Sequence, residues 1–243
     1  MMTTQQLRLP CYMTDFQYRM RPTAFMDLAQ QIGEDDAEEG GFGFSFLRER
    51  GLAWVLARQS VEFHTLPRFK DSLEMQTWHR GVSGPFYIRD YRLLAEDGTV
   101  AVASSSSWVL LDLKTRAMVM PGKVDLPAVS DAAPGQHALE GYATKVIPQR
   151  GVPWKRAGER TALFSDIDYN NHVNNVRYIG WALDVLPMEV LAQKPLRSLS
   201  INFNHEVHPG ETAELYLQEN PSGEYFVEGQ VESRQAFIVR LQV

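Results

Sequence analysis

The sequence predicts an α+β fold in which a sheet wraps around a central helix, and it predicts this arrangement twice. Two helical patterns lie in different halves of the chain, and each is followed by a run of strand patterns. With 243 residues, the chain has room for two domains of about 120 residues each. No residue-by-residue repeat is evident, so the repetition is inferred from the order of the elements.

The first helix is predicted to begin at Pro22, because proline at the first helical position loses no hydrogen bond. Apolar residues then recur at i, i+3, i+4 and i+7, which is one face of a helix: Phe25, Leu28, Ala29 and Ile32. The acidic run Glu34–Glu39 and the glycines after it end the element, and we interpret this run as a solvated helix end. A short strand is expected before the helix, over Cys11–Met20.

The rest of the first half, from Ala53 onward, is predicted to form strands. Val61 and Phe63 alternate with polar residues, which is the period of two of a half-buried strand. The pair Asp97-Gly98 predicts a tight hairpin turn. Further strands are expected over Leu73–Gly81, Phe86–Ala95 and Val100–Asp112.

A linker is predicted in the middle of the chain. Pro121–Gly135 is rich in Pro, Ala, Asp and Ser and shows no periodicity. We therefore expect an N-terminal domain over 1–125, a linker over 126–140 and a C-terminal domain over 141–243.

The second half repeats the order of the first. A strand over Thr161–Ser165 is followed by a helix over Asn174–Leu186. This helix is apolar on nearly every side, which is typical of a buried helix. The four strands expected after it are Leu196–Val207, Thr212–Glu219, Tyr225–Glu232 and Gln235–Val243.

Composition and charge disfavour several classes of protein. The chain has 24 Lys and Arg against 30 Asp and Glu, a net charge of −6, whereas nucleic-acid-binding domains are normally basic. No apolar stretch approaches the ~18 residues of a membrane span. Met1–Pro10 resembles neither a secretory signal nor an organelle transit peptide. The single cysteine, Cys11, excludes an internal disulfide and a cysteine metal cluster, so a cytoplasmic, bacterial-like setting is expected.

The densest polar cluster lies just before the buried helix, over Asp166–Asn175. Asp168, Asn170 and His172 are spaced i, i+2 and i+4, so an extended backbone would place all three on one side. Asn174 or Asn175 would be a suitable N-cap, and free N–H groups at the helix start can hold an oxyanion. Two interpretations stay open: a polar loop with an Asx turn and a cap, or a catalytic site with a carboxylate, an amide and an imidazole.

The segment from Ser165 to Trp181, SDIDYNNHVNNVRYIGW, closely resembles the catalytic segment of fatty acyl-ACP thioesterases, the plant plastid enzymes and their bacterial relatives. The resemblance covers the chain from about Phe16 to its end. Shorter matches in the first half follow the order of the family: Gly51–Arg58, Trp78, Arg89-Asp90, Ser107-Trp108-Val109 and Thr115-Arg116.

This resemblance implies two tandem hotdog domains, each a long helix wrapped by an antiparallel sheet. It also implies hydrolysis of the thioester between a fatty acyl chain and acyl carrier protein (ACP), which releases free fatty acid and ends elongation. No cofactor is expected, and a metal at His205 and His208 is discounted because no third ligand is evident. The alternatives are a hotdog acyl-CoA thioesterase and a non-catalytic acyl-binding module.

The family's catalytic residues match Asp168, Asn170 and His172, and a fourth position, a glutamate, matches Glu206. The cysteine that follows this glutamate in the family is Val207 here, so a cysteine nucleophile cannot operate. By pattern alone, Glu206 lies on the polar face of a predicted strand, and an ordinary exposed glutamate is the simpler interpretation. The family match reverses that preference.

We expect a metal-free hydrolysis in which Glu206 or Asp168 acts as a general base toward water or attacks directly to form a mixed anhydride. His172 would position or relay the proton, and Asn170 would orient the water or the carbonyl. The oxyanion would be held by N–H groups near Asn174 and Asn175.

Two further sets of residues are expected to bind the substrate. The acyl chain needs an apolar tunnel, which the resemblance places largely in the first repeat, with the candidates Phe25, Met26, Ala29, Leu52, Trp54 and Leu56. The acidic carrier needs a local positive patch, for which the candidates are Lys155, Arg156, Arg160 and Arg177, followed by Lys145 and Arg150. The sequence fits a monomer or a homodimer, and it does not specify the acyl chain length.

Overall fold

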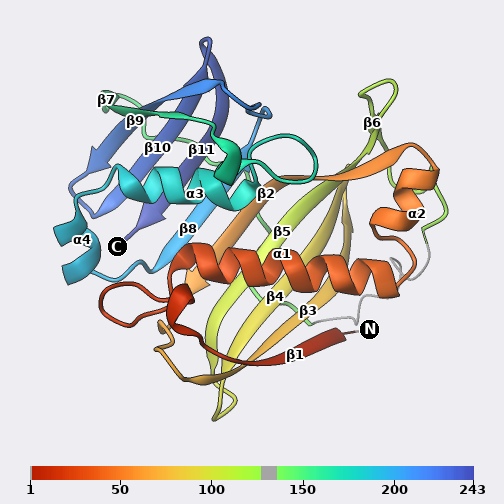
Figure 1. The fold of residues 1–243 in the computed structure, drawn as a ribbon, viewed down its shortest axis with the longest axis horizontal. Coiled ribbons are helices and arrows are strands. Elements are labelled where there is room, and N and C mark those ends of the chain that lie inside the picture. Colours follow the sequence, from red (N-terminus) through yellow and green to blue (C-terminus); the bar gives the residue numbers. More distant parts are fainter. Residues whose placement is uncertain (1, 127–135) are drawn as a thin grey trace. The chain divides into compact units, whose positions relative to one another are not determined.

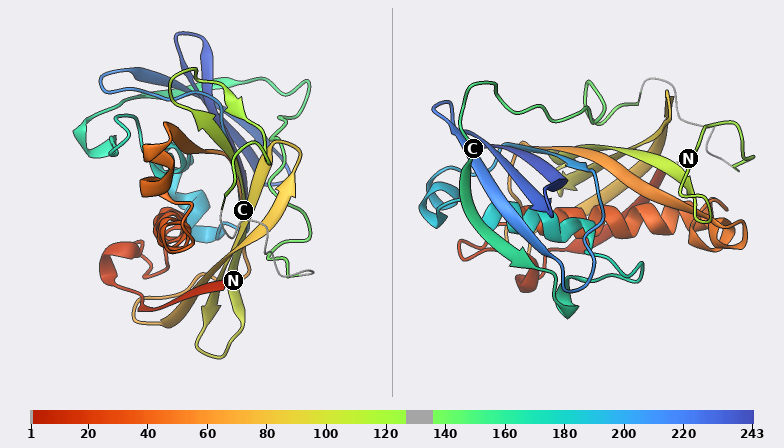
Figure 2. Two further views of the ribbon diagram at one scale, coloured as in Figure 1. Left: turned by 90° about the vertical axis from the view of Figure 1, so that its right-hand side faces the viewer. Right: turned by 90° about the horizontal axis from the view of Figure 1, so that it is seen from above.

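The computed structural model describes residues 2–126 and 136–243. The chain divides into two compact units, Met1–Ala143 and Thr144–Val243. In each unit a helix lies across one face of an antiparallel sheet (Figures 1 and 2). The predicted α+β class and the repeated order of elements are therefore confirmed. Within the described residues, no helix combines the length and the apolarity that crossing a membrane would require.

The sheet of the first unit has the strand order β1-β3-β4-β5-β2, and all neighbours are antiparallel. The predicted hairpin at Asp97-Gly98 is present, since the Gly98 N–H donates to the carbonyl of Ala95 at 2.9 Å. The strands are β1 (Met2–Arg8), β2 (Leu52–Phe63), β3 (Ser72–Ser83), β4 (Phe86–Ala95) and β5 (Val100–Asp112), and the short β6 (Met118–Val119) pairs with β5.

The first helix, α1 (Pro22–Glu39), packs against β3 and is followed by the short α2 (Phe44–Glu49). Pro22 is the first helical residue, as predicted. The acidic run is more than a solvated helix end, because Asp36 pairs with Arg89 of β4 at 2.5 Å. Their side chains are only 12% and 7% exposed, respectively, so the ion pair belongs to the interior of the unit.

The strand predicted over Cys11–Met20 is wrong. Cys11–Met13 is a 3₁₀ helix, η1, and the following turn is organised by the Asp15 carboxylate, which accepts the N–H groups of Gln17 and Arg19. The first strand is β1, which pairs along its whole length with β3. Because β1 is rich in Thr and Gln, it lacks the apolar alternation by which a half-buried strand is recognised.

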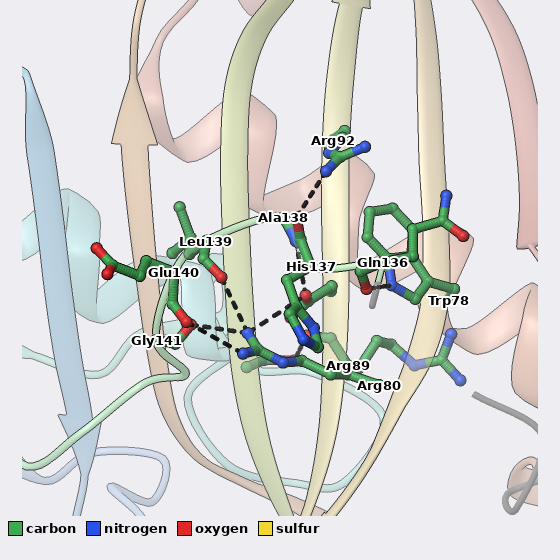
Figure 3. A network of polar contacts seen from close by, with 12 residues as sticks. Trp78, Arg80, Arg89, Arg92, Gln136, His137, Ala138, Leu139, Glu140 and Gly141 are labelled. Carbon is green, nitrogen blue, oxygen red and sulfur yellow. Dashed lines mark hydrogen bonds and ion pairs between the residues drawn. The ribbon is translucent and has the colours of Figure 1, made fainter. Parts of the chain in front are cut away.

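Residues 136–141 cross the strands of the first unit, including β3 and β4 (Figure 3). The Arg80 guanidinium donates to three successive carbonyls at 2.8–3.3 Å and lies 3.5 Å from the Asp90 carboxylate. Trp78, Asp90 and Arg92 bond the same segment through its backbone. Most of the predicted linker, 127–135, lies outside the described residues, but its last part is attached to the first unit.

The sheet of the second unit has the order β8-β11-β10-β9-β7. Its main helix, α3 (Asn175–Asp184), packs against β11 and buries five of its ten residues, whereas Arg177 and Asp184 are exposed. The helix is therefore buried on a broad face, and less completely than a helix that is apolar nearly all round. The other elements are β7 (Lys155–Thr161), β8 (Ser198–Phe203), β9 (Thr212–Asn220), β10 (Glu224–Val231), β11 (Arg234–Gln242) and the short α4 (Met188–Gln193).

Two strands of this unit differ from the prediction. The strand expected over Thr161–Ser165 is wrong, since β7 ends at Thr161 and Phe164–Asp166 is a 3₁₀ helix, η2. The strand expected over Leu196–Val207 ends at Phe203, so Glu206 does not lie on a strand. The N–H groups of residues 204 and 205 both donate to one carbonyl, that of Ala236, and the backbone leaves the ladder there.

A glycine allows an aromatic ring to fill the core of the second unit. Gly229 on β10 lies opposite Phe237 on β11, and a Cβ at Gly229 would lie 2.1 Å from this ring. The ring of Phe237 also packs against Tyr178 of α3, with the centroids 5.0 Å apart. An added methyl group would therefore force the Phe237 ring or the backbone of β10 to shift.

We expect Gly229→Ala to lower the free energy of unfolding by about 1–3 kcal/mol, because overpacking forces neighbouring groups out of their preferred positions. Gly141→Ala is the matched control, since a Cβ there meets no atom within 4 Å, and we expect it to change stability by less than about 0.5 kcal/mol. Chemical denaturation of both variants measures the difference. Equal stabilities would contradict this account of the core.

Candidate functional site

The polar cluster forms a tight turn between η2 and α3. The Asp168 N–H donates to the His172 carbonyl at 3.0 Å, and the Asn171 N–H donates to the Asp168 carbonyl at 3.0 Å. Ile167 and Val173 form an antiparallel bridge at its base. Asn171 adopts a left-handed φ of 62°, which asparagine tolerates better than most residues. The extended backbone expected here is wrong, and it is the folded turn that brings the ends of the segment together.

Asp168 and His172 face each other across this turn. The Asp168 Oδ1 and His172 Nδ1 atoms are 3.8 Å apart, and the side chains are 11% and 20% exposed, respectively. His172 Nδ1 also lies 3.2 Å from the carbonyl oxygen of Val173. With Nδ1 as the donor to this carbonyl, the neutral ring keeps its acceptor lone pair on Nε2. In this tautomer, Nε2 is the ring atom that can accept a proton.

Asn170 lies exposed at the turn. Its backbone N–H donates to Asp168 Oδ1 at 2.8 Å, which makes the Asx turn that the simpler interpretation of this loop requires. The Asx turn is thus formed by the backbone N–H of Asn170 and the side chain of Asp168. The proposed role of the Asn170 amide stays a prediction.

Glu206 is joined to the turn through the backbone. The Val173 N–H donates to the Val207 carbonyl at 2.8 Å, which links the residue after His172 to the residue after Glu206. The Glu206 side chain is 32% exposed, and its carboxylate lies 3.9 Å from His208 Nε2. The fold therefore attaches the segment of Glu206 to the turn that holds Asp168 and His172.

The start of α3 confirms one of the two predicted caps. Asn174 is the N-cap, since its Oδ1 accepts the Val176 N–H at 2.9 Å. The Asn174 N–H itself donates to the Asp166 carbonyl at 2.8 Å. This N–H is therefore engaged within the fold, and the proposed oxyanion contact shifts to the N–H of Asn175, the first helical residue.

Tyr178 belongs to this site, although the sequence pattern placed it only among the buried residues of the helix. Its hydroxyl accepts the Val207 N–H at 3.1 Å. Burial raises the pKa of Tyr178, and the nearby carboxylates of Glu206 and Asp168 raise it further. The hydroxyl therefore stays protonated at neutral pH. Helical periodicity shows that a tyrosine is buried, but it does not show what its hydroxyl bonds.

The residues predicted to dock the carrier lie on β7, on α3 and in the segment before β7. Arg156 and Arg160 are each paired with acidic side chains at 2.6–3.5 Å. Lys155 and Arg177 are exposed. Lys145 and Arg150 are exposed as well. The docking role of all six residues stays a prediction, and the charges of Arg156 and Arg160 are already partly neutralised.

The candidate acyl-tunnel residues all lie in the first unit. Five of them are buried, and Trp54 is partly buried and donates from Nε1 to the Phe42 carbonyl at 2.9 Å. The buried ones are Phe25, Met26, Ala29, Leu52 and Leu56. Burial is required of a core residue and of a tunnel wall alike, so their role in binding stays a prediction.

Other potential binding sites lie apart from this loop. A groove of about 530 Å³ in the second unit is lined by residues of the 144–149 segment and by side chains of β8, β10 and β11, and it includes none of Asp168, His172 and Glu206. Across 2–126 and 136–243, no three side chains of His, Cys, Asp or Glu gather as a possible metal site. The polar turn brings Asp168 and His172 to the start of α3.

Two family models match this chain. The acyl-ACP thioesterase N-terminal domain matches residues 1–122, and the acyl-ACP thioesterase C-terminal domain matches residues 157–239. The chloroplastic acyl-(acyl-carrier-protein) hydrolase FATB2 of Cuphea viscosissima is 32% identical over 193 residues, which are 76% of this chain and 46% of that protein. The chain spans about half the length of the relatives that it matches.

Solved structures share the fold of the whole chain. An acyl-ACP thioesterase from Bacteroides thetaiotaomicron superimposes with a TM-score of 0.88 at 24% identity, over 99% of this chain and 97% of that chain. The 12:0-ACP thioesterase from Umbellularia californica superimposes with a TM-score of 0.82 at 18% identity, over 99% and 96% of the two chains. The predicted pair of tandem hotdog domains is thereby confirmed.

The cap of α3 gives a direct test of the geometry of the turn. We expect Asn174→Ala to lower the free energy of unfolding by about 1 kcal/mol, because it removes the acceptor for the Val176 N–H. Asn175→Ala, one residue later, removes no cap and introduces a better helix former, so it should not destabilise. Thermal unfolding of the two variants makes the comparison. A larger loss from Asn175→Ala would contradict the assignment of the cap.

Proposed function

Because the chain belongs to the acyl-ACP thioesterase family, we propose that it hydrolyses the thioester between a fatty acyl chain and acyl carrier protein. The products are the free fatty acid and the thiol of the carrier, so the reaction ends elongation of that chain. The observation that supports this best is the hydrogen bond from the Val173 N–H to the Val207 carbonyl, at 2.8 Å. It joins the turn that holds Asp168 and His172 to the segment that holds Glu206.

The proposed chemistry needs a carboxylate and a histidine. Asp168 Oδ1 already accepts the Asn170 N–H and faces His172, so we assign Asp168 to orienting the turn and the imidazole. Glu206 is then the carboxylate that activates a water or attacks the thioester carbonyl directly to form a mixed anhydride. Val207 stands where the resembled family has a cysteine, so no thiol nucleophile is available at this position.

The bonds that change follow from this assignment. In the general-base route, water adds to the carbonyl carbon as Glu206 takes its proton, the C–S bond breaks, and the carrier thiolate leaves. His172, with its lone pair on Nε2, receives the proton and passes it to the departing sulfur. The N–H of Asn175 at the start of α3 faces the developing oxyanion, where a helix N-terminus is favourable for negative charge.

The carrier is expected to meet the surface beside this turn. When the acyl chain is bound in its tunnel, the sulfur end of the thioester points toward the surface. The carrier attached to this sulfur therefore stays outside the site. Exposed groups in this part of the chain include Lys155 on β7, Arg177 on α3 and the side chains of Leu163 and Phe164, which are 63% and 97% exposed. Since Arg156 and Arg160 already pair with acidic residues, we assign the docking charge chiefly to Lys155 and Arg177.

Replacing Glu206 tests the catalytic assignment. We expect Glu206→Gln to lower kcat for acyl-ACP by about 10²–10⁴-fold with little change in stability, because the amide cannot accept the proton from water. Glu189→Gln, an exposed glutamate on α4, is the control and should keep normal turnover. Purified protein is offered acyl-ACP and acyl-CoA in parallel, and release of the free thiol is followed.

The same assay separates the competing functions. Faster turnover of acyl-CoA than of acyl-ACP would favour a hotdog acyl-CoA thioesterase. Tight binding of either substrate without release of a thiol would favour an acyl-binding module. Normal turnover by Glu206→Gln would remove Glu206 from the mechanism.

Charge reversal tests the docking surface. We expect the double variant Lys155→Glu, Arg177→Glu to raise KM for acyl-ACP and to flatten its dependence on salt, because rim charges chiefly set the rate of association. Turnover of a small thioester without a carrier should stay nearly constant. The matched control is Lys194→Glu, Arg197→Glu, which changes the net charge equally in exposed residues between α4 and β8. An equal rise in KM for both double variants would show that only net charge matters.

A further inference from the structure

We propose that Tyr178 is a positioning residue of this site, whose hydroxyl holds the Glu206–Val207 segment in place for the reaction. The proposal rests on the proposed function and assigns a role to a residue that the sequence pattern placed only in the core. Tyr178 lies on α3, in the turn of helix that follows the Asn174 cap, and its side chain is only 3% exposed.

The ring of Tyr178 is fixed by other aromatic side chains. It packs edge-on against Trp181, with the centroids 5.6 Å apart, and it lies 5.9 Å from Phe203 and 5.0 Å from Phe237. These partners come from three different elements of the second unit, namely α3, β8 and β11. Because the ring is packed on several sides, the position of its hydroxyl is fixed. Such a hydroxyl is suited to positioning a backbone segment.

The hydroxyl holds a segment that the sheet no longer holds. The ladder of β8 ends at Phe203, and the N–H of His205 makes the last backbone contact with β11, at 3.0 Å from the Ala236 carbonyl. Two residues later, the Val207 N–H donates to the Tyr178 hydroxyl at 3.1 Å. Glu206 therefore lies between two fixed points, one supplied by the sheet and the other by Tyr178.

Both backbone groups of Val207 are engaged. Its N–H bonds to Tyr178 and its carbonyl accepts the Val173 N–H at 2.8 Å. A chain of contacts thus runs from α3 through Val207 to the residue that follows His172. Loss of the Tyr178 hydroxyl would remove one of the contacts that fix the Glu206–Val207 segment. The position of Glu206 relative to His172 would then be less well defined.

The surroundings of the hydroxyl agree with this role. The carboxylates of Glu206 and Asp168 both act on it and, after burial, raise the pKa of Tyr178. While the hydroxyl accepts from the Val207 N–H, it can still donate its own hydrogen to an acceptor.

The test replaces only the hydroxyl. Tyr178→Phe keeps the ring and its packing, and we expect kcat to fall by about 10–100-fold for acyl-ACP and for a small thioester without a carrier, by analogy with outer-shell groups that orient metal ligands. KM should stay within about twofold of the parent value, since the hydroxyl contacts no part of the substrate in this assignment. The acid limb of the kcat–pH profile should shift, because it reports the environment of the catalytic carboxylate.

Tyr225→Phe is the matched control. Tyr225 is a buried tyrosine on β10 whose hydroxyl bonds to Glu219, away from the proposed site. It removes a hydroxyl of the same kind and should leave kcat and the pH profile unchanged. Equal losses of kcat in the two variants, or a Tyr178→Phe enzyme with normal kcat, would overturn the proposal, as would a change in KM alone.

A second measurement needs no variant. In the parent protein, amide hydrogen exchange of Val207 should be slow, because its N–H is bonded to a buried hydroxyl. Exchange of Val207 at the rate of an open loop would overturn the proposal even if Tyr178→Phe failed to fold. The proposed function is tested separately by the activity of the parent protein. A parent protein that cleaves neither acyl-ACP nor acyl-CoA would contradict the proposed function, and the positioning role of Tyr178 would be contradicted as well.

Discussion

The hydrogen bond between the Val173 N–H and the Val207 carbonyl is the contact on which the arrangement of the proposed site depends. The Asp168–His172 turn lies between two helical elements, and Glu206 follows the end of β8, so neither is held by the sheet ladder. Irregular backbone keeps one geometry when its polar groups are paired with rigid neighbours. Here the pairing leads through Val207 to Tyr178 and the packed helix α3. The site therefore takes its rigidity from the core of the second unit, although its reacting groups lie on loops.

The sequence predicted the elements that bury one face and missed those that do not. The periodicities of α1 and of the strands β3, β4 and β5 follow from burial, and these elements are present close to the predicted bounds. By contrast, β1 and β7 are polar strands that each pair at the end of a strand order, and they form through backbone hydrogen bonds with β3 and β9. Such strands have no period of two in hydrophobicity, so a pattern based on burial cannot find them.

The sequence singled out candidate site residues, but it did not predict their geometry. Composition and the family resemblance pointed to Asp168, His172 and Glu206, because residue identities carry that information. Two details depended on single backbone contacts that no pattern encodes: the left-handed Asn171, which folds the turn, and the Ala236 carbonyl, which ends β8. A buried aromatic position likewise looks the same in sequence whether or not its hydroxyl has a partner.

The turn fills both roles of the structural interpretation that the sequence left open, and the catalytic interpretation stays a proposal. Asp168 makes the Asx turn and Asn174 makes the cap, so both structural roles are filled. Neither role engages the imidazole Nε2 of His172, and the Glu206 carboxylate lies 3.9 Å from His208 Nε2. Val207 adds a related point, because its side chain is fully buried while its N–H and carbonyl join α3 to the turn. At the position where the resembled family has a cysteine, this chain has a valine whose backbone joins α3 to the turn, and the mechanism that we propose therefore starts from the neighbouring carboxylate of Glu206.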